Sequence, residues 1–107
     1  MGTAKEPNFF ENLPPGRRET IEVLLQSGSV RIERIVSHGE ASPAGFWYDQ
    51  ENDEWVALLR GTATLEYAGG EQKPLRAGDY LLIPAKVKHR VSEVSQDALW
   101  LAFHLLK

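Results

Sequence analysis

The sequence predicts an all-β fold in one small domain. From Glu19 to Leu106, short runs rich in Val, Ile, Leu, Thr and aromatic residues alternate with clusters of Gly, Pro, Ser and Asp, a pattern typical of strands and turns. No segment shows the sustained period of a long amphipathic helix. Seven or eight short strands in about 90 residues are typical of a sandwich, a jelly roll or a small barrel.

Each expected strand is supported by its own residues. Residues 20–26 begin with β-branched side chains and stop at Gly28, which favours a strand over a helix. In residues 30–36 the apolar alternation changes face, which indicates a bulge or a strand that changes sheets. The Gly-Gly pair at 69–70 predicts a hairpin turn. The expected strands are 20–26, 30–37, 54–61, 62–68, 72–78, 79–84, 89–94 and 99–106.

The chain is expected to have a short arm followed by one folded unit. Residues 1–18 carry three of the six prolines and predict an irregular N-terminal arm, whereas residues 19–107 form the β domain. A chain of 107 residues has room for one modest core.

Composition excludes several classes of function. The net charge is -3 and no dense basic run is present, so we expect no nucleic-acid partner. The absence of cysteine excludes disulfides, thiolate nucleophiles and Cys-ligated metals. No segment has the apolar length of a signal peptide or a membrane span, so a cytoplasmic location and no membrane contact are expected.

Two segments contain residues that could form a functional site. Glu54 opens a strand-like run that ends at Gly61, and Gly78, Pro84 and His89 follow at fixed spacing. In these residues the sequence resembles the cupin family, whose first motif has six residues between its Glu and its Gly and whose second motif runs Gly, Pro, His. The resemblance covers roughly residues 19–106 and implies a jelly-roll barrel of the type called a double-stranded β-helix.

The resemblance also implies a metal site in which two usual ligands are absent. The family's first-motif histidines would fall on Tyr48 and Gln50, or on Trp47 and Asp49 with the longer spacing, and neither pair contains histidine. Oxygen ligands from Asp49 or Gln50 could complete an oxygen-rich site with one imidazole, which suits a divalent ion such as Fe, Mn, Ni or Zn. The expected metal ligands are Asp49, Gln50, Glu54 and His89.

Several other residues could line the same cavity. His104 shares a strand face with Trp100 and is expected to be either a cavity residue or a metal ligand. His38 is expected in an exposed loop, and the acidic residues Glu51 and Asp53 could belong to a solvated turn. The residues expected to line the cavity or contact substrate are Trp47, Tyr48, Trp100 and His104.

Three functions follow from the resemblance. The first is a metal-dependent cupin that binds or acts on a small organic molecule, with oxygenase, isomerase or lyase chemistry open. The second is a non-catalytic small-ligand-binding or sensor barrel with an altered metal site. The third is a structural dimerisation domain, because the family often pairs its sheets, and a homodimer is expected in each case. Fold alone does not select the reaction.

Overall fold

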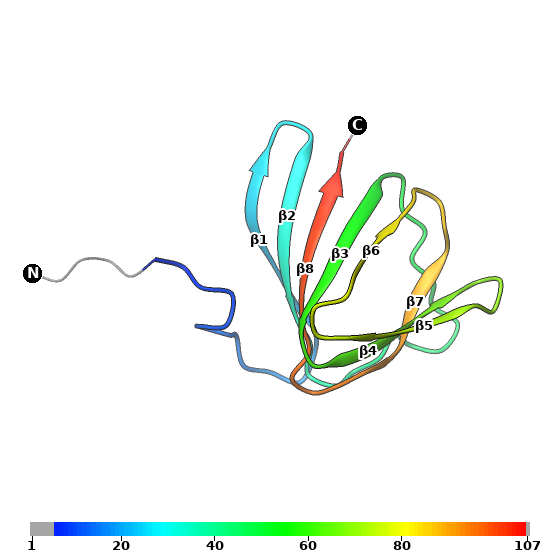
Figure 1. Ribbon diagram of the computed structural model, residues 1–107, viewed down its shortest axis with the longest axis horizontal. Coiled ribbons are helices and arrows are strands. Elements are labelled where there is room, and N and C mark those ends of the chain that lie inside the picture. The colour runs from blue at the N-terminus through cyan, green and yellow to red at the C-terminus, as the bar shows by residue number, and fades with distance from the viewer. Residues whose placement is uncertain (1–5, 107) are drawn as a thin grey trace, which may run out of the picture.

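The computed structural model describes residues 6–106 and shows two antiparallel β-sheets that face each other (Figure 1). The larger sheet has the strand order β1-β2-β8-β3-β6, and the smaller has the order β5-β4-β7. The two sheets do not join into a closed barrel. The strands are β1 (Thr20–Ser27), β2 (Val30–Val36), β3 (Asp53–Arg60), β4 (Thr62–Tyr67), β5 (Gln72–Arg76), β6 (Tyr80–Ile83), β7 (His89–Val94) and β8 (Leu99–Leu105).

The all-β prediction is confirmed. Every regular element within residues 6–106 is a strand, and each overlaps an expected run with ends that differ by no more than two residues. In the same part of the chain, no helix has the length and apolar character needed to cross a membrane. The Gly-Gly hairpin also forms, since β4 pairs with β5 and Gly70 N–H donates to the Tyr67 carbonyl.

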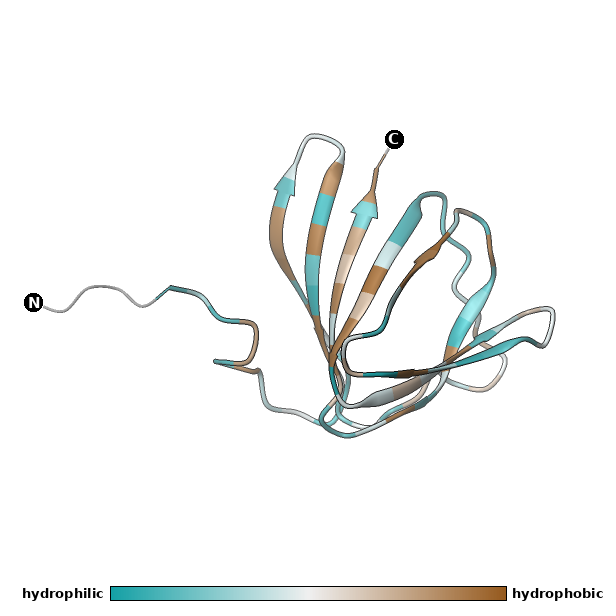
Figure 2. Cartoon of the chain, in the orientation of Figure 1, coloured by the Kyte–Doolittle hydropathy of each residue, from teal (hydrophilic) through white to brown (hydrophobic). Residues whose placement is uncertain are grey.

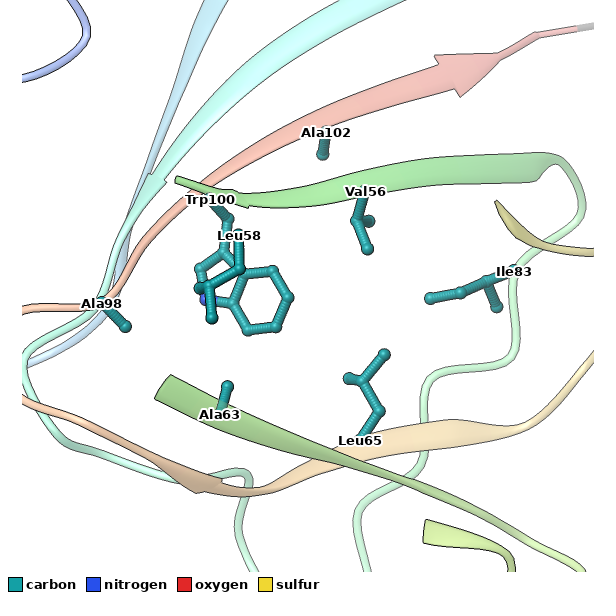
Figure 3. Close-up of a cluster of buried hydrophobic side chains, with 8 residues drawn as sticks. All are labelled: Val56, Leu58, Ala63, Leu65, Ile83, Ala98, Trp100 and Ala102. Atoms are coloured by element: carbon teal, nitrogen blue, oxygen red, sulfur yellow. The ribbon is translucent and has the colours of Figure 1, made fainter. Parts of the chain in front are cut away.

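The core lies between the two sheets. Strand side chains alternate between faces, so Val56 and Leu58 on β3 point inward together. They meet Leu65 from the smaller sheet across the gap (Figure 3). The complete buried cluster is Val56, Leu58, Ala63, Leu65, Ile83, Ala98, Trp100 and Ala102.

The irregularity expected in residues 30–36 lies in the neighbouring strand. The pairing of β1 with β2 shifts between Val23 and Leu25, so the extra residue is Leu24 on β1. β2 pairs with β8 without a shift. Each face of β2 carries both apolar and polar residues, seen as brown and teal bands along the strand (Figure 2), and the strand places Glu33 and Ile35 at the cavity between the sheets. The prediction of a bulge within β2 was therefore wrong, because both of its faces contact other parts of the protein.

Arg34 connects the outer face of β2 to the N-terminal segment. Its guanidinium group donates to backbone carbonyls within residues 8–12 at 2.8 to 3.4 Å. It also pairs with Glu22 on β1, with Nη2 and Oε1 2.7 Å apart. Residues 6–18 contain no strand or helix, and residues 1–5 of the expected arm lie outside the described part of the chain. Arg34 thus anchors an irregular segment to the larger sheet.

Candidate functional site

A small cavity of about 90 Å³ lies between the two sheets. Its walls are mostly apolar and its polar groups come from both sheets. The apolar wall includes Ile35, Val56, Leu65, Ile83, Val91 and Trp100. Trp100 and His104, both expected from the sequence to lie at a cavity, line this one from β8.

Glu54 and His89 meet across the cavity from opposite sheets. Glu54 lies near the start of β3 and is 6% exposed, and His89 begins β7 and is 4% exposed. Glu54 Oε1 lies 3.9 Å from His89 Nε2, which is too long for a hydrogen bond. His89 Nδ1 lies 2.9 Å from the Val87 carbonyl oxygen. A carbonyl oxygen only accepts, so Nδ1 carries hydrogen and the neutral ring keeps the Nε2 lone pair toward Glu54.

A second carboxylate and imidazole lie beside this pair. His104 Nε2 is 2.8 Å from Glu33 Oε1 on β2 and 3.9 Å from Glu54 Oε2. Arg31 Nε lies 3.0 Å from the other Glu33 oxygen. Sequence reasoning did not assign Glu33 to the site. Its strand face could have indicated that Glu33 points inward, because Glu33 shares that face with the apolar Ile35.

In the segment before β3, one of the two residue pairs considered from the sequence faces the cavity. Tyr48 and Gln50 line it, whereas Asp49 is exposed and Trp47 lies away from it with its ring under the Arg90 guanidinium group. Tyr48 and His89 exchange two backbone hydrogen bonds, of 2.7 and 3.1 Å. The Tyr48 ring also stacks on the His89 ring, with centroids 5.4 Å apart. The structure therefore brings Gln50 and Tyr48 to the site, but not Asp49 or Trp47.

Glu51, Asp53 and His38 lie outside the cavity lining. Glu51 is exposed, and Asp53 accepts a hydrogen bond of 2.7 Å from the Ala85 backbone N–H, which fixes a turn. His38 was expected to be solvent-exposed, but it is half-buried, and its Nε2 has no hydrogen-bond partner among the described residues. The prediction for His38 was therefore wrong, because its loop packs against the protein.

Burial raises the pKa of three groups at the cavity, Glu54, Glu19 and Tyr48. Desolvation raises the pKa of the Glu54 carboxyl above its usual value; His104 and His89 oppose this rise and Glu33 adds to it. At the cavity edge, desolvation and the nearby carboxylates of Glu54 and Glu40 raise the pKa of Glu19. Desolvation, Glu19 and Glu54 similarly raise the pKa of the Tyr48 hydroxyl. The cavity thus disfavours additional negative charge.

The donor set only partly fits a metal ion. Within residues 6–106, no group of three or more His, Asp or Glu side chains is arranged to hold one ion. Glu54 and His89 leave unshared lone pairs facing each other, whereas the Nε2 atom of His104 is already bound to Glu33. Two candidate ligands are therefore in position and a third is engaged elsewhere.

Comparison with known proteins identifies the family. A model described as a cupin domain matches residues 32–104, which is more than half of the chain. The chain belongs to the cupin family. This confirms the cupin-type jelly roll expected from the spacing of Glu54, Gly61, Gly78, Pro84 and His89.

Solved cupin structures share the whole architecture. A provisionally named mannose-6-phosphate isomerase from Ralstonia eutropha JMP134 is 39% identical, with a TM-score of 0.89, and the match covers 97% of this chain and 100% of that one. A cupin from Desulfovibrio desulfuricans is 20% identical, with a TM-score of 0.77 and coverage of 96% and 97%. A cupin superfamily protein from Desulfitobacterium hafniense is also 20% identical, with a TM-score of 0.75 and coverage of 98% and 94%. No curated protein matches the chain.

Proposed function

We propose that this cupin binds a small organic molecule beside a divalent metal held by Glu54 and His89. The observation that carries the proposal is the 3.9 Å gap between Glu54 Oε1 and His89 Nε2 inside the protein. A buried carboxylate is costly unless a cation or a hydrogen-bond donor faces it. The Val87 carbonyl orients His89 as a second ligand shell commonly orients a metal-binding imidazole.

The neighbouring residues would support such an ion. Gln50 lines the same cavity and offers an amide oxygen, so the donors are nitrogen and oxygen atoms suited to Fe, Mn, Ni or Zn. When bound, the ion would supply Lewis-acid or redox chemistry to a substrate. Tyr48 covers one face of His89, and most of the cavity wall around the site is apolar.

The cavity favours a small ligand without a phosphate group. None of its lining residues in the described chain is Lys or Arg, and three are glutamates: Glu19, Glu33 and Glu54. Its volume of about 90 Å³ is below the roughly 300–1,000 Å³ of sites for drug-sized ligands. The name given to the Ralstonia relative includes a sugar phosphate, but here no cationic wall residue would balance that charge. The ligand is therefore expected to be compact and largely apolar.

A metal-free ligand-binding barrel is the second candidate function. The hydrogen bond between Glu33 and His104 favours it, because this bond occupies an imidazole nitrogen that a stronger metal site would need. In this case a ligand should raise the melting temperature by the same amount with and without a chelator. The metal-dependent function requires the chelator to reduce that stabilisation.

Elemental analysis tests the metal proposal directly. Protein purified without chelator or affinity tag should contain close to one divalent ion per chain. His89→Ala and Glu54→Ala should each lose most of it. Glu51→Ala is the matched control, since it removes a carboxylate from the same segment but at an exposed position outside the cavity. Native protein without metal after reconstitution with Fe(II), Mn, Ni and Zn would contradict the proposal.

We also propose that the protein is a homodimer. An apolar row crosses all five strands of the larger sheet on its outer face. Such a surface is larger than the isolated apolar side chains usual on a monomer. A second copy of the chain would cover it. The row consists of Leu25, Ile32, Phe103, Trp55 and Leu82.

A further inference from the structure

The two histidines of the cavity are engaged in opposite ways. His89 bonds through Nδ1 to a backbone carbonyl and leaves Nε2 free, whereas His104 uses Nε2 to contact Glu33 Oε1 at 2.8 Å. At that distance a hydrogen lies between the two atoms. The Nε2 atom of His104 therefore has no lone pair available for a cation, whether the ring donates or accepts.

We propose that Glu33 is a positioning residue that withholds His104 from the metal. While Glu33 stays in place, an ion has Glu54 and His89 as its protein ligands of the carboxylate and imidazole type. When Glu33 is removed, His104 Nε2 is released 3.9 Å from Glu54 Oε2 and becomes a third ligand. This inference rests on the proposed metal site and says what limits its affinity in this chain.

Glu33 is fixed in its position from two sides. It is 7% exposed, and Arg31 Nε holds its second oxygen at 3.0 Å. The pairing of β2 with β8 places Arg31 opposite His104 and Glu33 opposite Ala102, so the three polar residues occupy neighbouring positions on adjacent strands. Strand register, rather than a flexible loop, sets the Glu33–His104 contact. The contact is therefore built into the fold.

The proposed role of Glu33 predicts a change in metal affinity opposite to the change that its charge alone would cause. Removing a buried carboxylate near a cation should weaken metal binding if Glu33 acts only through its charge or is itself a ligand. If Glu33 competes for His104, its removal should strengthen binding, because a released imidazole joins the site. The direction of the change in affinity therefore separates the two roles.

The test is a double-mutant cycle read by metal affinity. Metal-free protein is titrated with Co²⁺, followed by calorimetry and by the visible absorption that reports the ligands of cobalt. The cycle contains the native chain, Glu33→Ala, His104→Ala and the double variant. Glu66→Ala is the matched control, because it breaks another ion pair, between Glu66 and Arg90 on the smaller sheet, away from the cavity lining.

The expected result is strong non-additivity. Glu33→Ala should bind Co²⁺ about tenfold more tightly and change the absorption spectrum, in line with the 10–100-fold effects of changing a ligand's partner. The double variant should lose that gain, whereas His104→Ala alone should stay within about twofold of the native value. Glu66→Ala should match the native chain. Glu33→Gln, which keeps the size of the side chain, should also increase the affinity for Co²⁺, but by less. If Glu33→Ala fails to fold, Glu33→Gln takes its place in the cycle.

The other outcomes overturn the inference or separate it from the metal proposal. If Glu33→Ala binds Co²⁺ no more tightly, or if His104→Ala weakens the native site as much as His89→Ala, Glu33 does not withhold His104. If the native chain binds no metal but Glu33→Ala does, the proposed native metal function fails and the inference stands. If neither binds metal, both fail.

Discussion

At Glu54, burial has two consequences that act together. The carboxyl group lies between two imidazoles, yet the loss of water dominates and raises its pKa. The folded protein therefore holds a proton on Glu54 at pH values where the unfolded chain has released it. The ionised form of such a group lowers the stability of the folded protein, and a bound cation would offset that loss. The pH dependence of the stability of the metal-free protein therefore reports the burial of Glu54.

We predict that Glu54→Gln stabilises the metal-free protein at neutral pH. Because the pKa of Glu54 is raised above its usual value of 4.5, native stability should fall as pH rises from 4.5 through the raised value and then level off. The glutamine variant lacks this fall. Melting temperatures in chelator should be similar near pH 4 and higher for the variant at pH 7. A variant less stable than the native chain at pH 7 would show instead that the imidazoles favour the ionised carboxylate.

At the scale of elements, two glycines shape the ends of the strands that carry the site. Gly61 joins β3 to β4 with φ of +85°, and Gly78 precedes β6 with φ of +97°. Both conformations lie in the left-handed region that disfavours side chains. The two positions differ in their surroundings, since a Cβ atom at Gly61 would lie 2.8 Å from Ala98 Cα, whereas at Gly78 it would meet open space.

We predict that Gly61→Ala is more destabilising than Gly78→Ala. Gly78→Ala should cost about 1–2 kcal/mol for the left-handed conformation alone. Gly61→Ala should add roughly 1–3 kcal/mol, because the methyl group collides with backbone that cannot move aside easily. Urea unfolding of both variants measures the difference directly. Equal losses would mean that the turn at residues 95–98 adjusts, and that only backbone conformation requires Gly61.

The strands could be predicted from the sequence more fully than the site. Strand bounds depend on local alternation and on turn residues, so they were recovered to within two residues. Glu54 and His89 were found because their spacing resembles the cupin motifs. Glu33 depends on the pairing of β2 with β8, which is a non-local property. The segment before β3 has no repeating period, so only the structure separates Tyr48 and Gln50 from Trp47 and Asp49.

At the scale of the whole molecule, the outer face of the larger sheet carries exposed aromatic and apolar residues. Trp55 packs against Tyr80 and Phe103, with ring centroids 5.4 and 5.5 Å away. Tyr80 remains 67% exposed and Leu82 50% exposed. Antiparallel sheets usually present polar residues on a face that contacts water. In the proposed dimer, a second copy of the chain would cover this aromatic cluster.

We predict that the native chain is a dimer and that Leu82→Glu separates it into monomers. A charged side chain within an apolar contact would be desolvated without a partner, which costs several kcal/mol. Light scattering after gel filtration measures the mass of each species at micromolar concentration. Phe46→Glu is the matched control, because Phe46 is 43% exposed but belongs to a loop rather than to a strand of the larger sheet. A native monomer, or a Leu82→Glu variant that stays dimeric, would remove this face as the dimer interface.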